Sequence, residues 1–105
     1  METTEKAAAL NTLVTFSRTY QFEGQSIGEI DLDGMDSLTA KDMIEAEKYL
    51  TKTGTISALP DQTIEYACFI ASRISNQPIE FFKGLSPRDM NRVKNRITGF
   101  FYGEG

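Results

Sequence analysis

Carboxylates are the side chains of this sequence that come nearest to a reactive pattern, because the chain has no histidine and one cysteine. A zinc site or a nucleophilic triad of the common kinds requires the residue types that are missing. Glu45 and Glu47 lie two positions apart, so a helix would place them on different faces, where they could not act as an acid–base pair. Asp31, Asp33 and Asp36 surround a glycine turn but lack the full spacing and terminal glutamate of a calcium loop. We therefore expect no catalytic and no metal site, and interpret the three aspartates as a solvated turn.

The motif Asp36-Ser37-Leu38 is the one pattern that would support a covalent modification. It resembles the attachment site of acyl and peptidyl carrier proteins, in which the serine takes a phosphopantetheine arm at the start of a helix. The acidic, amphipathic segment that follows is similar to that family. Carrier proteins are helical bundles, however, and residues 13–32 here alternate like strands. The other interpretation is that Asp36, Ser37 or Thr39 caps a helix, which is the common role of these residue types.

Charge and composition narrow the classes of partner. The 105 residues carry a net charge of −4, which disfavours nucleic acid. No apolar run approaches ~18 residues and the N-terminus lacks the layout of a signal peptide, so we expect a cytoplasmic protein without a membrane segment. Cys68 is interpreted as a core residue, and the glycines match no phosphate-binding pattern. We expect no cofactor and no enzymatic activity. The basic residues near the C-terminus are interpreted as the solvated face of a helix: Arg88, Arg92, Lys94 and Arg96.

Residues 13–32 alternate between apolar or aromatic side chains and polar ones, with a turn signal at 23–25. Period-two alternation with β-branched and aromatic residues predicts two strands joined as a β-hairpin. An isolated hairpin is marginally stable in water, so its aromatic face must pack on helices or pair with another chain. Residues 1–12 show no clear period, and we expect a flexible N-terminus there.

Helical patterns follow the hairpin. The first and last of them begin alike, with a hydroxyl residue as N-cap (Thr39, Ser86) and an acid three positions later (Asp42, Asp89). The broad apolar face of the second predicts the most buried helix. The fold class is therefore predicted as α+β, a small and mostly helical single domain over residues 13–103, with the hairpin followed by three main helices and a short helical turn. The expected helical segments are about 39–52, 62–75, 78–83 (the short turn) and 86–102.

Aromatic side chains are concentrated toward the C-terminus. Adjacent residues of a helix point about 100° apart, so neighbouring aromatics cannot easily all face one small core. We therefore expect at least one member of each aromatic group to be exposed and to contact a partner. The five candidate partner-binding residues are Phe81, Phe82, Phe100, Phe101 and Tyr102.

The order of these motifs resembles that of the tail assembly chaperones of long-tailed bacteriophages and prophages. The likeness covers roughly residues 14–103. It rests on the Phe-x-Gly hairpin turn at 22–24, the Leu-Thr-x-x-Asp helix start at 38–42, Glu65-Tyr66-Ala67, and the Leu-x-x-x-Asp…Phe-Phe ending at 85–101. The resemblance implies a small non-enzymatic protein that coats the tape-measure protein in the host cytoplasm. It would keep that protein soluble until the tail tube polymerises around it, and would be absent from the mature virion.

The partners implied by the resemblance are the tape-measure protein, the tail-tube protein and further copies of the same chain. The hairpin edge and the terminal aromatics are the two candidate surfaces for self-association or client binding. Two other classes of function stay open from the sequence. One is a carrier protein with Ser37 as the attachment site, and the other is a small structural virion protein such as a head–tail connector.

Overall fold

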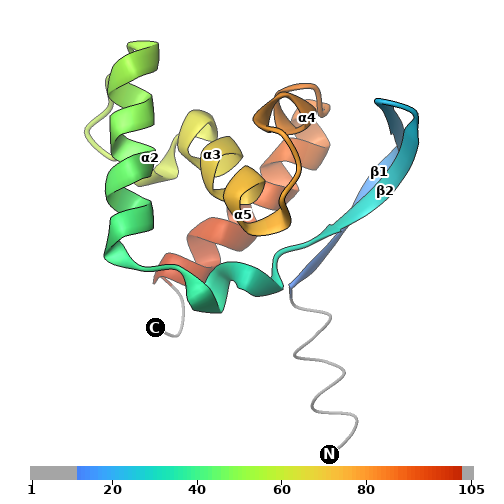
Figure 1. Ribbon diagram of the computed structural model, residues 1–105, viewed down its shortest axis with the longest axis horizontal. Helices are drawn as coiled ribbons and strands as arrows, with labels where there is room; N and C mark the ends of the chain where they lie inside the picture. Colours follow the sequence, from blue (N-terminus) through green and yellow to red (C-terminus); the bar gives the residue numbers. More distant parts are fainter. Residues whose placement is uncertain (1–11, 103–105) are drawn as a thin grey trace, which may run out of the picture.

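The computed structural model describes residues 12–102 of the chain. Its elements, in order, are β1 (Leu13–Phe22), β2 (Gln25–Asp31), the 3₁₀ helix η1 (Asp33–Ser37), α2 (Ala40–Thr53), the 3₁₀ helix η2 (Pro60–Gln62), α3 (Ile64–Ser75), α4 (Ile79–Lys83) and α5 (Pro87–Tyr102). The fold is α+β, as predicted. The hairpin stands on one side and α2 on the other, with α3, α4 and α5 between them (Figure 1). The predicted flexible N-terminus, residues 1–12, lies outside the described residues except for Thr12.

Strands β1 and β2 are antiparallel and are joined by the two-residue turn Glu23-Gly24, whose φ angles are 48° and 81°. Positive φ at both positions is typical of the type I′ turn, which matches the twist of the flanking strands. Gly24 adopts this conformation at low cost because it has no Cβ. The turn therefore fixes the start of the register, with Phe22 opposite Gln25.

The middle of the hairpin is irregular. Thr15 lies opposite Glu29 and Tyr20 lies opposite Ile27, so four residues of β1 face one residue of β2. Strand β1 therefore bulges, and the backbone groups of the bulge cannot all pair with β2. One of them, the N–H of Ser17, instead donates to a side chain of α5.

Both predicted N-caps are present. The N–H of Thr39, just before α2, donates to the Asp42 carboxylate at 2.8 Å. The hydroxyl of Ser86, just before α5, accepts a hydrogen bond from the N–H of Asp89 at 3.3 Å. Helix α2 ends at Gly54, whose φ of 81° is the left-handed conformation that glycine favours after a helix.

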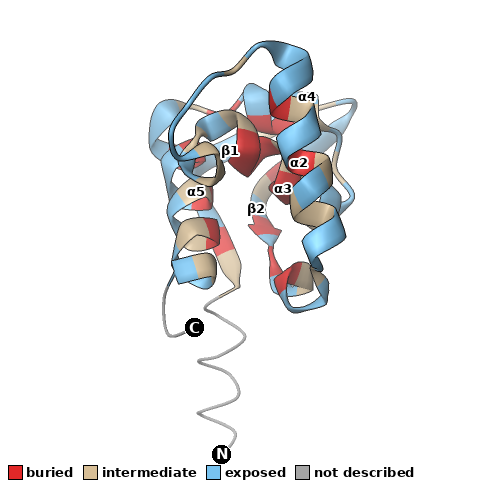
Figure 2. Ribbon diagram, turned by 90° about the vertical axis from the view of Figure 1, so that its left-hand side faces the viewer, coloured by how far each residue is buried: buried red, intermediate tan, exposed pale blue. Residues whose placement is uncertain are grey.

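Helix α3 begins two residues later than the predicted start at about 62. Residues 60–62 form η2, and Thr63 is the N-cap, since its hydroxyl oxygen accepts from the N–H of Tyr66 at 3.2 Å. The predicted position of α3 at the centre of the fold is confirmed. It contacts α2, α4, α5, η1 and η2, and Tyr66, Cys68 and Ile70 are at most 1% exposed. Buried residues of the hairpin and of the helices face one shared interior (Figure 2).

The aspartate-rich segment after the hairpin forms the helix η1, which the sequence interpretation as a solvated turn missed. Asp33 and Asp36 are exposed, but Met35 is buried. Gly34 approaches α3 so closely that a Cβ added to it would lie 2.9 Å from Cγ2 of Ile74. Element η1 is therefore packed against α3 on one face and solvated on the other.

Candidate functional site

Phe81 and Phe82 are both buried, at 3% and 0% exposure, so the expectation that one of this pair is exposed was wrong. Helix α4 has the hairpin on one side and helices α3 and α5 on the other. The Phe81 ring packs against the hairpin, 5.4 Å from the ring of Phe22, while Phe82 lies beside Cys68 of α3 and Met90 of α5. Side chains that point about 100° apart can both be buried where a helix has neighbours on two sides. Neither phenylalanine is available to a partner.

The other aromatic group, at the end of α5, is exposed as expected. Phe100 is 42% exposed and Tyr102 is 56% exposed. Phe101 is half-buried, with its ring edge-on to that of Tyr66 at 6.2 Å. The Tyr102 hydroxyl donates to the Asp61 carboxylate of η2, and this hydrogen bond to the carboxylate raises the pKa of Tyr102. The end of α5 is therefore held in place by Phe101 and Tyr102, while Phe100, whose ring centroid lies 6.0 Å from that of Phe101, keeps part of its ring in solvent.

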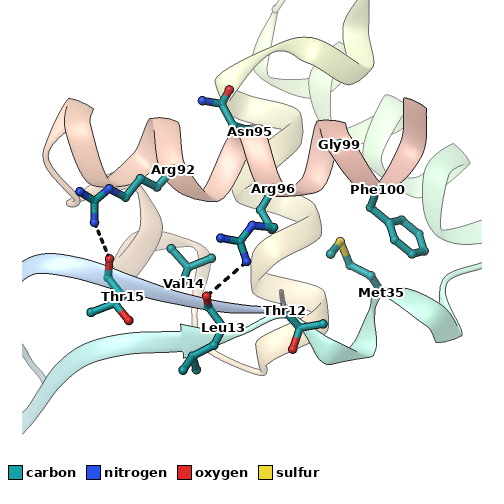
Figure 3. A pocket seen from close by; sticks show the side chains of 10 residues that line it. All are labelled: Thr12, Leu13, Val14, Thr15, Met35, Arg92, Asn95, Arg96, Gly99 and Phe100. Atoms are coloured by element: carbon teal, nitrogen blue, oxygen red, sulfur yellow. Dashed lines mark hydrogen bonds between the residues drawn. The ribbon is translucent and has the colours of Figure 1, made fainter. Parts of the chain in front are cut away.

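Phe100 forms one end of a cleft between α5, η1 and the beginning of β1, with a volume of about 720 Å³ (Figure 3). We call it the α5–β1 cleft. Phe100, Arg92 and Arg96 project from α5 toward the strand and η1. The residues that line it are Thr12, Leu13, Val14, Thr15, Met35, Arg92, Asn95, Arg96, Gly99 and Phe100. The α5 members of this lining are spaced at i, i+3, i+4, i+7 and i+8 along one helix face, and this spacing is the signal in the sequence that could have indicated the surface.

The two arginines of the cleft bind the edge of β1. A guanidinium nitrogen of Arg92 donates to the Thr15 carbonyl at 2.8 Å, and one of Arg96 donates to the Leu13 carbonyl at 3.2 Å. The Thr12 carbonyl accepts from the N–H of Leu32 on the other side, and strand carbonyls alternate in direction, so these two carbonyls point away from β2. Arg92 and Arg96 therefore do more than form a solvated face. They occupy the edge of β1 at 13–15, which is part of the hairpin edge predicted as a surface for self-association or client binding.

The described lining of the cleft is basic, whereas the whole chain is acidic. Among the described residues that line it, Arg92 and Arg96 are basic and none is acidic, while the protein has a net charge of −4. The hydrogen bond from Arg92 to the Thr15 carbonyl does not neutralise the guanidinium, because a carbonyl carries no net charge. Between these charges the cleft offers apolar surface from Leu13, Val14 and Met35, besides Phe100. The arrangement has the mixture of apolar and basic side chains that suits binding of a polypeptide.

Asp89 fixes the position of α5 relative to the hairpin. It is completely buried, and its carboxylate accepts from the N–H and hydroxyl of Ser17 at 2.8 and 2.9 Å, from the Tyr20 hydroxyl, and from the Ser86 hydroxyl at 3.3 Å. Burial opposes ionisation, but the hydrogen bonds from Tyr20, Ser17 and Ser86 outweigh it and hold the pKa of Asp89 below its usual range. The carboxylate also lies in the first turn of α5, where the helix dipole favours negative charge. These hydrogen bonds hold the bulge of β1 against the start of α5. They therefore fix the distance between β1 and α5 at one end of the cleft.

The other residues with possible chemistry lie apart from the cleft. Ser37 is exposed as the last residue of η1, two positions before the N-cap of α2. The Asp31 carboxylate accepts hydrogen bonds from the Thr12 hydroxyl and from the N–H of Asp33. It therefore links the start of β1 to the residues that follow β2. Cys68 is 1% exposed, and burial raises the pKa of its thiol to about 11, which makes it unreactive at neutral pH.

Acidic side chains do not converge in the part of the chain that the structure describes. Glu45 forms an exposed ion pair with Lys48 at 4.0 Å, one helical turn away, and Glu47 is exposed. Within residues 12–102, no group of three or more acidic or cysteine side chains is arranged to hold a metal ion. Over the same residues, no helix is both long and apolar enough to cross a bilayer.

Comparison with family models, curated proteins and solved structures found no match to this chain. The motifs of the sequence and the geometry of the cleft are therefore the basis for proposing a function.

Proposed function

We propose that the protein is a non-enzymatic tail assembly chaperone of a long-tailed bacteriophage or prophage. It binds the tape-measure protein in the host cytoplasm, keeps it soluble while the tail tube assembles, and is absent from the mature virion. The observation that carries the proposal is the exposed Phe100 beside an open, partly apolar cleft, at the end of the helix whose Leu-x-x-x-Asp…Phe-Phe pattern is similar to that family.

The surface has the properties that such a client requires. A long, largely helical protein aggregates through its exposed apolar stripes, so a chaperone must cover a stripe without burying the whole client. An open cleft along a helix fits the side of another helix, as in other helix-in-groove complexes. Coating a long client takes many copies, and self-association needs a second surface. Ile56 and Leu59, which are 96% and 55% exposed in the loop between α2 and η2, are the apolar residues that we assign to it.

Co-expression with the tape-measure protein tests the proposal. The variant Phe100→Ala should leave the client largely in the insoluble fraction, because Phe100 is exposed and its removal takes apolar contact from the client surface and little from the core. Ile44→Ala on α2 is the matched control, since Ile44 is 52% exposed and lies away from the cleft, and it should keep the client soluble. Equal solubility of the client with both variants would show that the end of α5 does not contact the client.

The virion itself distinguishes a chaperone from a structural component such as a head–tail connector. Mass spectrometry of purified particles should detect the tube and tape-measure proteins and not this chain. A stoichiometric amount of the chain in particles would contradict the chaperone assignment and favour the structural one.

The carrier alternative has one observation in its favour, which is the exposure of Ser37. Incubation with coenzyme A and a broad-specificity phosphopantetheinyl transferase, followed by intact-mass measurement, decides it. We expect no mass increase, because Ser37 ends a 3₁₀ helix that follows a β-hairpin, whereas carrier proteins present the serine at the start of a helix in a helical bundle.

A further inference from the structure

Two buried hydroxyl groups at the C-terminal end of α5 have no hydrogen-bond partner within residues 12–102. They are the hydroxyl of Tyr66, which comes from α3, and Oγ1 of Thr98 on α5 itself. A buried hydroxyl without a partner destabilises the state in which it is buried, because it has lost its bonds to water and gained none in return. The folded position of this end of α5 is therefore less stable than its apolar packing alone would make it.

The Tyr66 hydroxyl lies close to the last turn of α5. Tyr66 is completely buried, and its ring is edge-on to that of Phe101 at 6.2 Å. Burial is the main cause that raises the pKa of Tyr66 to about 12. Smaller contributions in the same direction come from Asp61, Glu47 and Tyr102, which places these groups near the hydroxyl. Two of them, Asp61 and Tyr102, form the hydrogen bond that joins the end of α5 to η2.

The last turn of α5 is intrinsically weaker than the turns before it. Gly99 lowers the stability of the helix relative to alanine, because glycine loses more conformational freedom on folding. In α5 as the structure describes it, this turn also contains no basic side chain to interact favourably with the helix dipole. Val93 and Ile97, which are at most 1% exposed, hold the preceding turns in the core. The boundary between the well-packed helix and its weaker end therefore falls just after Ile97.

From these observations we propose that residues 98–102 detach from α3 and η2 while the rest of α5 stays packed. We call this segment the α5 latch. Opening of the latch breaks the ring contact of Phe101 and the hydrogen bond of Tyr102. The same movement lets water reach the hydroxyls of Tyr66 and Thr98, which offsets part of that loss. Opening therefore requires much less free energy than unfolding of the whole chain.

The open latch presents a second aromatic side chain to the client. Phe101 is half-buried when the latch is closed, whereas Phe100 is already exposed. A client that contacts both rings binds the open state better and shifts the population toward it. This step rests on the proposed function, since the client is the tape-measure protein, but opening itself is a property of the chain without a client.

Amide hydrogen exchange of the full chain without a client tests the latch. Helix ends fray, so fast exchange of residues 98–102 does not by itself distinguish a latch from an ordinary helix end. The decisive substitution is Tyr66→Phe, because it changes α3 and leaves α5 intact. Removal of the hydroxyl stabilises the closed state, so exchange of residues 98–102 should become about 5-fold slower or more. Unchanged or faster exchange would overturn the proposal.

Tyr102→Phe should act in the opposite direction. It removes the hydrogen bond to Asp61 and keeps the ring, and Tyr102 is 56% exposed, so the core is left intact. Because the closed state loses an interaction, exchange of residues 98–102 should become about 2- to 5-fold faster. Slower exchange in this variant would contradict the proposed closed state.

Tyr49→Phe on α2 is the matched control, since it makes the same chemical change in a tyrosine outside the latch. The Tyr49 ring packs 5.3 Å from that of Phe69 on α3 and 5.4 Å from the ammonium group of Lys83. Its replacement should leave the exchange of residues 98–102 unchanged. An effect as large as that of Tyr66→Phe would show that the latch does not respond to the Tyr66 hydroxyl specifically, and would overturn the proposal.

Co-expression with the tape-measure protein tests whether the client uses the open latch. Tyr66→Phe should reduce the soluble fraction of the client about 2-fold or more, because fewer copies are open, and Tyr49→Phe should not. If Tyr66→Phe slows exchange but keeps the client soluble, the client does not select the open latch, and this inference is rejected while the proposed function stands. If Phe100→Ala keeps the client soluble, the proposed function fails instead, and the exchange measurements still decide whether the latch opens.

Discussion

The Asp89 carboxylate joins the bulge of β1 to the first turn of α5. Its counterpart at the start of α2 is Asp42, which occupies the same position of an almost identical helix start. Asp42 is partly exposed and pairs with Arg73 of α3 at 2.9 Å, whereas Asp89 is completely buried and accepts from neutral donors of the hairpin. The same pattern of a hydroxyl N-cap followed by an aspartate therefore has two roles. In α2 the aspartate belongs to a solvated cap, and in α5 it forms a buried connection to the hairpin.

Alanine substitution at these two positions should separate the two roles. Asp89→Ala removes the acceptor for the Ser17 N–H and hydroxyl and the Tyr20 hydroxyl, and burying such donors without partners costs about 1–3 kcal/mol each. We expect a loss of about 3–5 kcal/mol in the free energy of unfolding, measured with urea. Asp42→Ala, the control, should cost clearly less because its partners can turn to water. Similar losses for both would contradict the structural difference.

The stability of the protein should fall in acid partly through Asp89. Since the folded-state pKa of this carboxyl lies below its unfolded value of about 3.9, its ionised form stabilises the fold at neutral pH. That contribution is present above pH ~4 and is lost as the pH drops from there toward the folded-state pKa. Urea unfolding at a series of pH values should show a shallower acid dependence for Asp89→Asn than for the wild type. An unchanged slope would assign the acid sensitivity to other carboxyls, such as Asp42, whose pKa the Thr39 N–H lowers.

At the scale of elements, η1 fits closely against α3. Gly34 lies against Ile74 of α3, where a Cβ would be 2.9 Å from Cγ2. This contact lets the chain pass from the hairpin to α2 close beneath α3, and it places Met35 at the base of the α5–β1 cleft. The packing of η1 thus connects the core to the candidate site.

A double-mutant cycle on Gly34 and Ile74 tests that fit. Gly34→Ala should cost about 1–3 kcal/mol of unfolding free energy, because the new methyl group overlaps Cγ2 of Ile74. Ile74→Ala removes Cγ2, so the double variant should lose less than the sum of the single losses. Additive losses in chemical denaturation would show that the two positions do not touch.

For the whole molecule, the hairpin and the helices form one core. Phe16 of β1 is buried and packs 6.0 Å from Phe81 of α4, between ring centroids. The hairpin supplies Val14, Phe16, Ile27 and Ile30 to the same cluster as the buried residues of α3 and α5. A two-stranded hairpin is unstable alone, so its stability comes from this shared packing.

Phe16→Ala should therefore destabilise the helices together with the hairpin. We expect a loss of about 3–5 kcal/mol, and helix melting followed at 222 nm should move to lower temperature as a single transition. Thr15→Ala is the control in the same strand, because Thr15 is exposed and its carbonyl, the acceptor for Arg92, is kept. A helix transition that does not respond to Phe16→Ala would mean that the hairpin folds independently.

The local signals of the sequence were sufficient for the hairpin and the four α-helices, with the start of α3 two residues off, but not for the 3₁₀ helices η1 and η2. Alternation predicted the hairpin, the Thr39 and Ser86 caps predicted where α2 and α5 begin, and the broad apolar face of α3 predicted its central place. These features depend on side chains within a few positions of each other, which is why periodicity and capping rules reach them. The α+β class followed from the same signals.

The residues that form the candidate site depend on packing between segments far apart in the chain. The burial of both Phe81 and Phe82 depends on α4 having the hairpin on one side and α3 on the other. Likewise, the solvated-face interpretation of the α5 arginines did not anticipate that Arg92 reaches a strand carbonyl 77 positions earlier in the chain. The sequence by itself determined the hairpin, the four α-helices and the concentration of aromatic residues toward the C-terminus. Only the tertiary structure decided which aromatic residues are exposed. It also decided that Arg92, Arg96 and Gly99 line one cleft with residues of β1. The physical reason is that contacts between segments far apart in the chain produce no periodic pattern in the sequence.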